Sequence, residues 1–193
     1  MRSDARHNRE RVLDVTVELV LEVGGEPTRE SIAERAGVGI GTVYRHFPDR
    51  QSLLHAVARH ALERTIAAGE TILTDSADGD PLRHYLHAAI DSGIGAVNMI
   101  HPLLDDTDWP DLRARAEKVL AAVIERNAER HPRRVAFSAN DIVFATIRFG
   151  RPLAVGLPPS DDRAIAHLQL DRLVDGLSSR TPPSRASRKP APT

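Results

Sequence analysis

The residues best suited to a chemical task lie in one short run, Gly39–Arg50, which reads GIGTVYRHFPDR. The run brings hydroxyl donors, an imidazole and two guanidinium groups close together along the chain. The planar guanidinium of Arg45 fits the O6 and N7 atoms of guanine in a bidentate contact. Thr42 offers a hydroxyl for a phosphate oxygen and a methyl group for a thymine methyl. The chemistry that this run predicts is noncovalent recognition of DNA.

Two short helices joined by a tight turn would hold this run at the surface. Ala33 is small where the two helices would cross, Gly37 permits the positive φ of the turn, and Val43 packs the second helix on the first. A turn of this shape presents its second helix outward, into a DNA major groove. We expect helices of about residues 28–36 and 40–46, the second one stopped by Pro48.

The stretch from Thr28 to Leu54 closely resembles the DNA-binding domain of the TetR family of bacterial transcriptional regulators. The segment Gly39–Pro48 is similar to that family's signature almost residue for residue. The resemblance implies an all-α chain: a three-helix N-terminal domain, a long connecting helix, and a larger helical domain for ligand binding and dimerisation. It covers roughly residues 10–60, whereas the C-terminal half matches only in helical character, length and the ending Gln169–Leu177.

Eight residues are expected to meet DNA, and each also has a purely structural explanation. Thr28 is first a helix N-cap, yet a capped helix N-terminus also binds phosphate well. Gly39 and Gly41 either punctuate the helix or let backbone N–H groups approach phosphate. Tyr44 is either a core ring or, following a buried valine, a side chain at the sugar-phosphate edge. The histidine and the second arginine resemble the family's phosphate contacts. The expected set is Thr28, Gly39, Gly41, Thr42, Tyr44, Arg45, His46 and Arg50.

Charge alone does not predict a nucleic-acid partner. The 193-residue chain has a formal net charge of −1, and residues 1–60 hold nine arginines and nine carboxylates. DNA-binding domains are usually basic. Only placement favours DNA, because Arg45, His46 and Arg50 cluster at the end that would face the groove, while the acids fall mostly in the first helix and the linker.

Composition limits the other function classes. The chain has no cysteine, which excludes disulfides and thiolate metal sites. No apolar run approaches the roughly 20 residues of a membrane span, and the N-terminus lacks the apolar region of a signal peptide. A cytoplasmic protein with no membrane partner is therefore expected. No phosphate-cradling loop, nucleophile elbow, metalloprotease spacing or redox pair is present, so neither an enzyme nor a cofactor is expected.

Helical periodicity continues through the rest of the chain, without sustained alternation of period two. The other expected helices are residues 6–23, 49–74, 81–99, 110–130, 138–155 and 161–178. The expected domains are residues 1–48 for DNA binding and 49–178 for effector binding and dimerisation, with 49–74 as the connecting helix. Residues 179–193, rich in proline and serine, are expected to form a disordered tail.

A cavity for a small organic effector is expected between the helices 81–99, 110–130 and 138–155. Gly93 and Gly95 would each cost a helix about 1 kcal/mol relative to alanine, which room for a ligand or close helix packing would justify. The alternative is an ordinary, loosely packed core. The candidate lining residues are Tyr85, Gly93, Asn98, Met99, Trp109, Phe137, Phe144 and Arg148. For Arg148 an anionic effector and a dimer interface are both open.

Histidines raise a metal site as a competing idea. His84, His87 and His101, with Asp91, include two histidines three positions apart, which share a helix face. These histidines fall at the flanks of the helix's apolar face, so we expect surface histidines and no metal.

A homodimer is expected through the helices 138–155 and 161–178, because their apolar surface exceeds what one short helix buries in a small domain. Two recognition helices would then bind two half-sites of a double-stranded, pseudo-palindromic DNA operator. The resemblance implies a ligand-responsive regulator, most simply a repressor. The alternative is an architectural or nucleoid-associated DNA-binding protein that senses nothing. A C-terminal domain of more than 100 residues is larger than dimerisation needs and argues against it.

Overall fold

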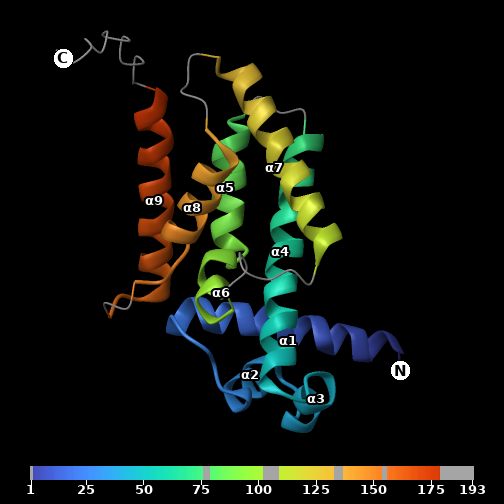
Figure 1. Cartoon of the computed structure of the whole chain (residues 1–193). Coiled ribbons are helices and arrows are strands. Elements are labelled where there is room, and N and C mark those ends of the chain that lie inside the picture. Colours follow the sequence, from blue (N-terminus) through green and yellow to red (C-terminus); the bar gives the residue numbers. More distant parts are fainter. Residues whose placement is uncertain (1, 76–78, 102–108, 133–136, 154–155, 179–193) are drawn as a thin grey trace, which may run out of the picture.

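Helices provide all the regular secondary structure in the part of the chain that this computed structural model describes, residues 2–75, 79–101, 109–132, 137–153 and 156–178. This confirms the expected all-α fold; the expected tail 179–193 lies outside the described residues. The helices are α1 (Arg2–Val23), α2 (Arg29–Ala36), α3 (Ile40–His46), α4 (Arg50–Thr74), α5 (Pro81–Asp91), α6 (Ile94–Ile100), α7 (Pro110–Arg130), α8 (Ala139–Phe149) and α9 (Pro159–Ser178) (Figure 1).

Capping residues explain the boundaries of the N-terminal helices. Thr28 caps α2 by accepting a 3.2 Å hydrogen bond from the backbone N–H three residues later. Asp49 and Ser52 form a reciprocal capping box at the start of α4. Gly37 ends α2 with φ 63°, a left-handed conformation that favours glycine. The helix-turn-helix expected from the sequence therefore forms, with the second helix over the expected residues 40–46.

The single helix expected over residues 81–99 is wrong, because the chain forms two helices there. Gly93 separates α5 from α6 with φ 76° and is the N-cap of α6. Its left-handed backbone is a conformation that other residues adopt only with strain. Gly93 is therefore a helix boundary rather than a mid-helix glycine.

Gly95 does lie within a helix, but close packing explains it rather than a void. A Cβ atom at Gly95 would stand 2.8 Å from the carbonyl oxygen of Thr146 and 2.9 Å from backbone atoms of Gly150. The absent side chain thus lets α6 lie directly against the end of α8. That helix ends at Phe149, earlier than the expected residue 155.

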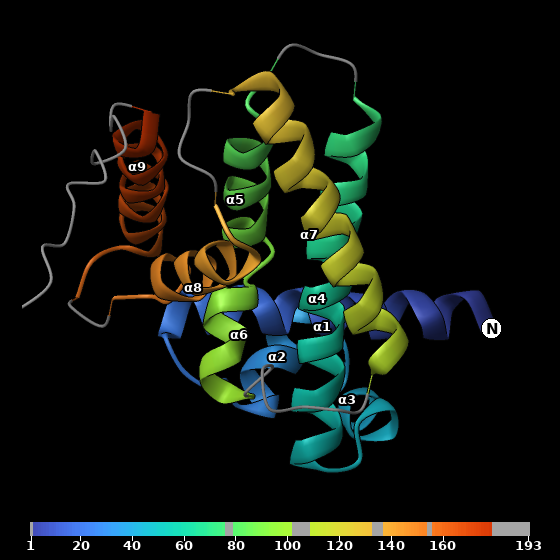
Figure 2. The ribbon, with the colours of Figure 1, turned by 45° about the horizontal axis from the view of Figure 1, so that its top comes forward.

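Two hydrophobic clusters organise the described helices. The first joins α1, α2, α3 and the first half of α4, and it includes Val97 of α6 and Trp109. The second joins α5, α7, α8 and α9. Figure 1 shows α1 lying crosswise below α5, α6 and α7 and across α4, with α2 and α3 below α1. Figure 2 shows α8 between α9 on one side and α5 and α6 on the other.

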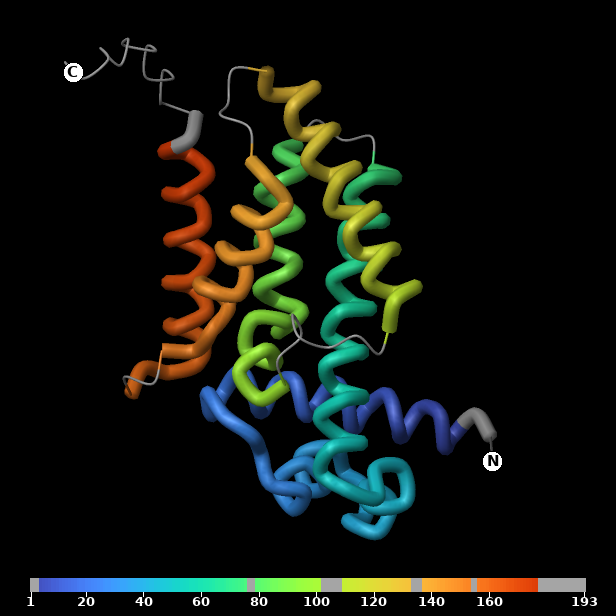
Figure 3. The backbone as a smooth tube through the Cα atoms, in the orientation of Figure 1, coloured from blue at the N-terminus to red at the C-terminus, as the bar shows by residue number. Residues whose placement is uncertain are grey.

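Helix α4 belongs to both halves of the molecule. It has 25 residues, about 37 Å at 1.5 Å per residue. Figure 3 follows it from its start beside α3 up to its packing between α5 and α7. A tilt of α4 would therefore displace α3, because only three residues separate the two helices along the chain. Among the described residues, every helix is too short or too polar to cross a membrane.

Candidate nucleic-acid interface and adjoining cavity

The outer face of α3 is open to solvent along its whole length. Gly39 and Gly41 are exposed, and a Cβ atom at either position would meet no other group within 4 Å. Neither glycine has a positive φ. The packing of this chain therefore does not require glycine at these positions, whereas the close approach of a phosphate backbone would favour it.

Helix α3 buries one residue and leaves the others at least partly exposed, as a recognition helix requires. Val43 is fully buried, as is Phe47 just after the helix. Tyr44 is 45 % exposed, which agrees with the expected outward direction. Arg45 is exposed and makes no ion pair or hydrogen bond with the described residues. Arg45 is thus available for a contact with a base edge.

Arg50 differs from Arg45 because it already has an ionic partner. Its Nε lies 2.9 Å from both carboxylate oxygens of Glu26, in the linker between α1 and α2. The Arg50 side chain is 68 % exposed. Exposed ion pairs contribute about 0–1 kcal/mol, so a phosphate can compete with Glu26 for this guanidinium.

Tyr44 is held by a residue that the sequence interpretation did not single out. The guanidinium carbon of Arg29 lies 4.7 Å from the centroid of the Tyr44 ring. The same side chain donates a 3.4 Å hydrogen bond to the carbonyl oxygen of Phe47. A cation over an aromatic face is attractive by about 0.5–2 kcal/mol. Arg29 at the start of α2 therefore fixes the position of Tyr44 and the end of α3.

A cavity of about 200 Å³ lies among α4, α5, α6, α7 and α8. Most of its lining is aliphatic. The other lining side chains are two threonines, one tyrosine, and the charged residues Arg113 and Glu117 of α7. The lining residues are Leu62, Thr65, Ile66, Tyr85, Ala89, Ile94, Arg113, Ala116, Glu117, Leu120, Ile142, Val143, Thr146 and Ile147. The cavity lies where the sequence predicted a space, with α4 as an additional wall.

Tyr85 is the polar group most clearly placed for a ligand. The residue is 8 % exposed, and burial raises the pKa of its hydroxyl to about 12. The hydroxyl therefore stays protonated at neutral pH and can donate a hydrogen bond. It makes no hydrogen bond to the described residues. A ligand that offers an acceptor at this wall would satisfy it.

Comparisons with known proteins agree with this geometry. Residues 12–57 match the model of the "Bacterial regulatory proteins, tetR family". A TetR transcriptional regulator from Streptomyces coelicolor has a similar structure, with a TM-score of 0.60 and 28% identity, over 88% of this chain and 97% of that one. The chain belongs to the TetR family. The match to the family model spans the helix-turn-helix and the start of α4.

Other relatives are similar over shorter stretches or at lower identity. An HTH-type transcriptional regulator of Staphylococcus aureus (strain USA300) is 37% identical over 76 residues, which are 39% of this chain and 41% of that protein. The chain thus matches less than half the length of this curated relative. The TetR-like regulator LfrR of Mycobacterium smegmatis, solved with proflavine, shares the fold with a TM-score of 0.54 at 24% identity, over 86% of this chain and 95% of that one.

Of the eight residues expected around the cavity of this TetR-family chain, only Tyr85 is among the lining residues. Gly93 faces α1 instead, and Trp109 packs on the ring of His55 with centroids 4.2 Å apart. Phe137 packs against the second hydrophobic cluster. The remaining four lie half-buried or exposed outside the lining: Asn98, Met99, Phe144 and Arg148.

The lining residues of α7 were not predicted from the sequence, because they share one helix face and are not the largest apolar side chains. Arg113, Ala116, Glu117 and Leu120 repeat at intervals of three and four and so share one face of α7. Searching for one face per helix, instead of for large side chains, would have found them. Choosing which face points inward still requires the packing of five helices.

The candidate metal residues do not converge. His84 is exposed beside Gly79, and His101 lies near His55, with ring centroids 5.8 Å apart. No group of three or more metal-ligating side chains among the described residues could hold an ion. His87 is half-buried rather than a surface histidine, and it lies against a second histidine, His167.

Proposed function

We propose that this protein is a ligand-responsive transcriptional repressor that binds a pseudo-palindromic DNA operator as a homodimer in the cytoplasm. The proposal divides the chain into residues 1–48 for DNA binding and 49–178 for effector binding and dimerisation, joined by the connecting helix. One observation carries it. Only three residues separate the start of helix α4 from the end of α3, and three turns later α4 provides Leu62, Thr65 and Ile66 to the cavity.

Two kinds of contact support the DNA-binding half of the proposal. Arg45, exposed and unpaired among the described residues, is suited to read guanine in the major groove. The capped N-terminus of α2 at Thr28 and the open backbone at Gly39 and Gly41 are suited to phosphate. Thr42, Tyr44, His46 and Arg50 complete the proposed surface.

The dimer half of the proposal rests on apolar side chains that no described residue covers. Phe144 of α8 is 60 % exposed and Leu168 of α9 is 48 % exposed. Arg148 is exposed four residues after Phe144, on the same face of α8, and away from the cavity. That position favours an interface role for Arg148 over contact with an effector. By contrast, Leu170 and Val174 are buried within their own chain.

The cavity supports a small organic effector. Its volume of about 200 Å³ exceeds the roughly 150 Å³ of an apolar cavity known to bind benzene. A mostly apolar molecule of one ring or a short chain, with one hydrogen-bond acceptor for Tyr85, fits this lining. Proflavine is a ligand of LfrR, and the similarity between LfrR and this chain is a similarity of fold alone.

The proposed release mechanism uses contacts between the cavity walls and α1. Ile94 of α6 lines the cavity, and its neighbour Gly93 packs on Val17 of α1. His60 of α4 lies 2.8 Å from the carboxylate of Asp14 of α1. A ligand that moves α4 or α6 therefore acts on the helix that supports α2 and α3. Couplings between two such sites are commonly 1–3 kcal/mol.

Footprinting on the DNA upstream of the protein's own gene tests the proposal. We expect one protected pseudo-palindrome, and a mobility shift on that sequence at concentrations where random DNA of equal length stays free. Protection without sequence preference would instead indicate an architectural DNA-binding protein. No binding to either DNA would contradict both interpretations.

A further inference from the structure

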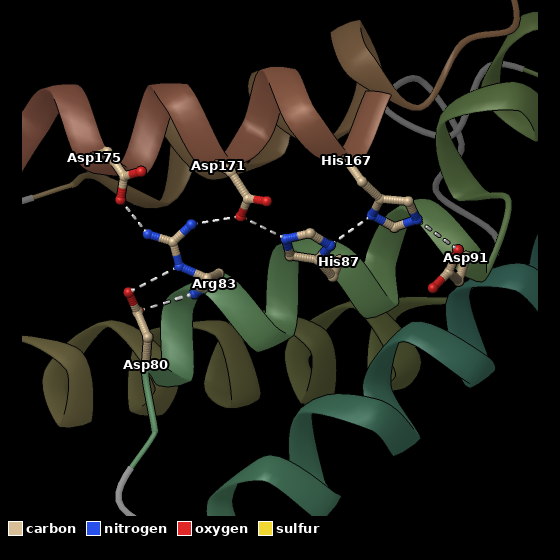
Figure 4. Close-up of polar contacts among 7 residues, drawn as sticks. All are labelled: Asp80, Arg83, His87, Asp91, His167, Asp171 and Asp175. Carbon is tan, nitrogen blue, oxygen red and sulfur yellow. Dashed lines mark hydrogen bonds and ion pairs between the residues drawn. The ribbon is translucent and has the colours of Figure 1, made fainter. Parts of the chain in front are cut away.

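A row of charged and titratable side chains joins α5 to α9 (Figure 4). The two helices run antiparallel, and each contributes three residues spaced four apart, so that all six face one another across the helix pair. These residues form what we term the α5–α9 clasp: Arg83, His87 and Asp91 of α5 with His167, Asp171 and Asp175 of α9.

The two histidines occupy the middle of the clasp and touch each other. Their Nδ1 atoms are 2.6 Å apart, and their rings are parallel within 4°. The Nε2 of His87 lies 2.9 Å from a carboxylate oxygen of Asp171. The Nε2 of His167 lies 3.0 Å from a carboxylate oxygen of Asp91. Every ring nitrogen of the pair therefore has a partner.

These three contacts determine how many protons the pair holds. An ionised carboxylate only accepts hydrogen bonds, so both Nε2 atoms must carry a hydrogen. The contact between the two Nδ1 atoms needs one hydrogen, donated by one ring and accepted by the other. Three hydrogens on four nitrogens make one imidazolium and one neutral imidazole. A fourth hydrogen would set two N–H groups against each other, and removing one would leave a contact without a donor.

We propose that His87 and His167 bind one shared proton and that this proton makes the packing of α9 on α5 sensitive to pH. Histidine is the side chain that ordinarily changes charge between pH 5 and 8. The clasp is complete when the pair is singly protonated, and it weakens when the pair gains a second proton or loses the shared one. This inference does not depend on the proposed function.

The charges around the pair support a single positive charge between the helices. Asp91 and Asp171 contact the histidines directly, and Arg83 pairs with Asp171 and Asp175 at one end of the row. Asp80 also pairs with Arg83, at 3.4 Å. The charged residues of α8, which packs on both helices, are Asp141 and Arg148, and neither contacts a clasp histidine. On α9, Arg163 lies one turn before His167.

The geometry fits a proton better than a metal ion. Two nitrogens bound to one tetrahedral zinc at about 2.05 Å would lie about 3.3 Å apart, farther than the 2.6 Å between the Nδ1 atoms. The described residues also contain no cluster able to hold an ion. A shared hydrogen requires a short contact such as this one.

The clasp shares α5 with the cavity. Tyr85 and Ala89 line the cavity, whereas Arg83, His87 and Asp91 face α9. A change in the packing of α9 on α5 therefore affects the same short helix that forms one wall of the cavity.

The test compares thermal unfolding of the full-length wild type, His87→Gln and His167→Gln across pH 5–9 at constant ionic strength. His84→Gln is the matched control, because His84 is an exposed histidine of α5 outside the clasp. We expect the midpoint temperature of the wild type and of His84→Gln to exceed that of the clasp variants by about 2–4 °C. The gap should be largest at one intermediate pH and close toward both ends. Equal pH profiles for the wild type and His167→Gln would overturn the proposal.

Nitrogen-15 spectra of the wild-type histidines provide a test that needs no variant. At the pH of greatest stability, both Nε2 atoms should be protonated, and the two Nδ1 atoms should share one hydrogen. Two fully unprotonated Nδ1 atoms would contradict the shared proton. Zinc added to the wild type should not raise the midpoint temperature; a rise that His167→Gln abolishes would replace the proton with a metal.

Discussion

Gly93 and Val17 lie so close that a Cβ atom on Gly93 would stand 2.5 Å from Cγ1 of Val17. Gly93 begins α6, and the next residue, Ile94, lines the cavity. Val17 is a buried residue of α1. Gly93, which packs on α1, therefore directly precedes a residue that lines the cavity, and α1 in turn supports the recognition helix.

Substituting Gly93 should test how tightly this junction is packed. Gly93→Ala adds a side chain to a backbone with φ 76° and forces it against Val17. Left-handed strain and overpacking each cost about 1–3 kcal/mol. We expect the free energy of unfolding to fall by at least 1 kcal/mol, measured by urea denaturation.

The Val17→Ala background separates the two causes. It removes the atom that the new methyl would meet but leaves the backbone strain, so the cost of Gly93→Ala should shrink without vanishing. Equal costs in both backgrounds would show that the contact with Val17 is unimportant.

Arg45 and Arg50 should have different roles on DNA. Arg45→Ala should weaken specific binding by about 1–3 kcal/mol and relax the preference at one base position per half-site. Arg50→Ala should weaken binding to all sequences alike and reduce the salt slope by about 1. Anisotropy titrations on the operator and on random DNA at several salt concentrations measure both effects.

Glu26→Gln is the control for Arg50. It removes the carboxylate that holds the guanidinium and should strengthen binding to every sequence. Equal losses of specific and nonspecific binding in the Arg45 and Arg50 variants would refute the division into a base-reading and a phosphate-binding arginine.

Phe144→Glu should convert the proposed dimer into a monomer, because it replaces an exposed apolar side chain of the proposed interface with a charge. Val23→Glu provides the control, since Val23 is a similarly exposed apolar residue, 65 % exposed, at the end of α1. Sedimentation at micromolar concentration distinguishes the two states. A wild-type monomer would contradict the dimer.

Asp171 should contribute stability that depends on pH. The hydrogen bond from His87 is the largest effect on the pKa of Asp171; burial opposes it, and the pairing with Arg83 adds to it, so that the pKa lies below its ordinary value of 3.8. A lowered folded-state pKa adds stability that is fully present above the unfolded pKa and is lost as the pH falls through the folded pKa. Asp171→Asn should therefore lower the urea midpoint at pH 6, and its gap from the wild type should narrow below pH 4. A gap independent of pH would contradict this.

The helix-turn-helix could be predicted because its determinants are local. A small residue at Ala33, a positive φ at Gly37 and a buried Val43 occur within eleven positions, and the structure contains all three. The α5–α9 clasp could not be predicted, because His87 and His167 are 80 positions apart and meet only when two helices pack. The role of Gly93 could not be predicted either, because it depends on the left-handed backbone conformation at this residue rather than on the absent side-chain volume.

The measurement that tests the central claim most directly is release of the operator when the cavity is filled by a side chain. Ala116→Leu places a larger group at the cavity wall on α7, and Ala121→Leu makes the same change at an exposed position of the same helix. Operator binding is titrated with a compound that releases the wild type in a library screen. We predict that Ala116→Leu binds the operator normally but resists release, whereas Ala121→Leu behaves as the wild type. Normal release of Ala116→Leu would show that the effector does not act through this cavity.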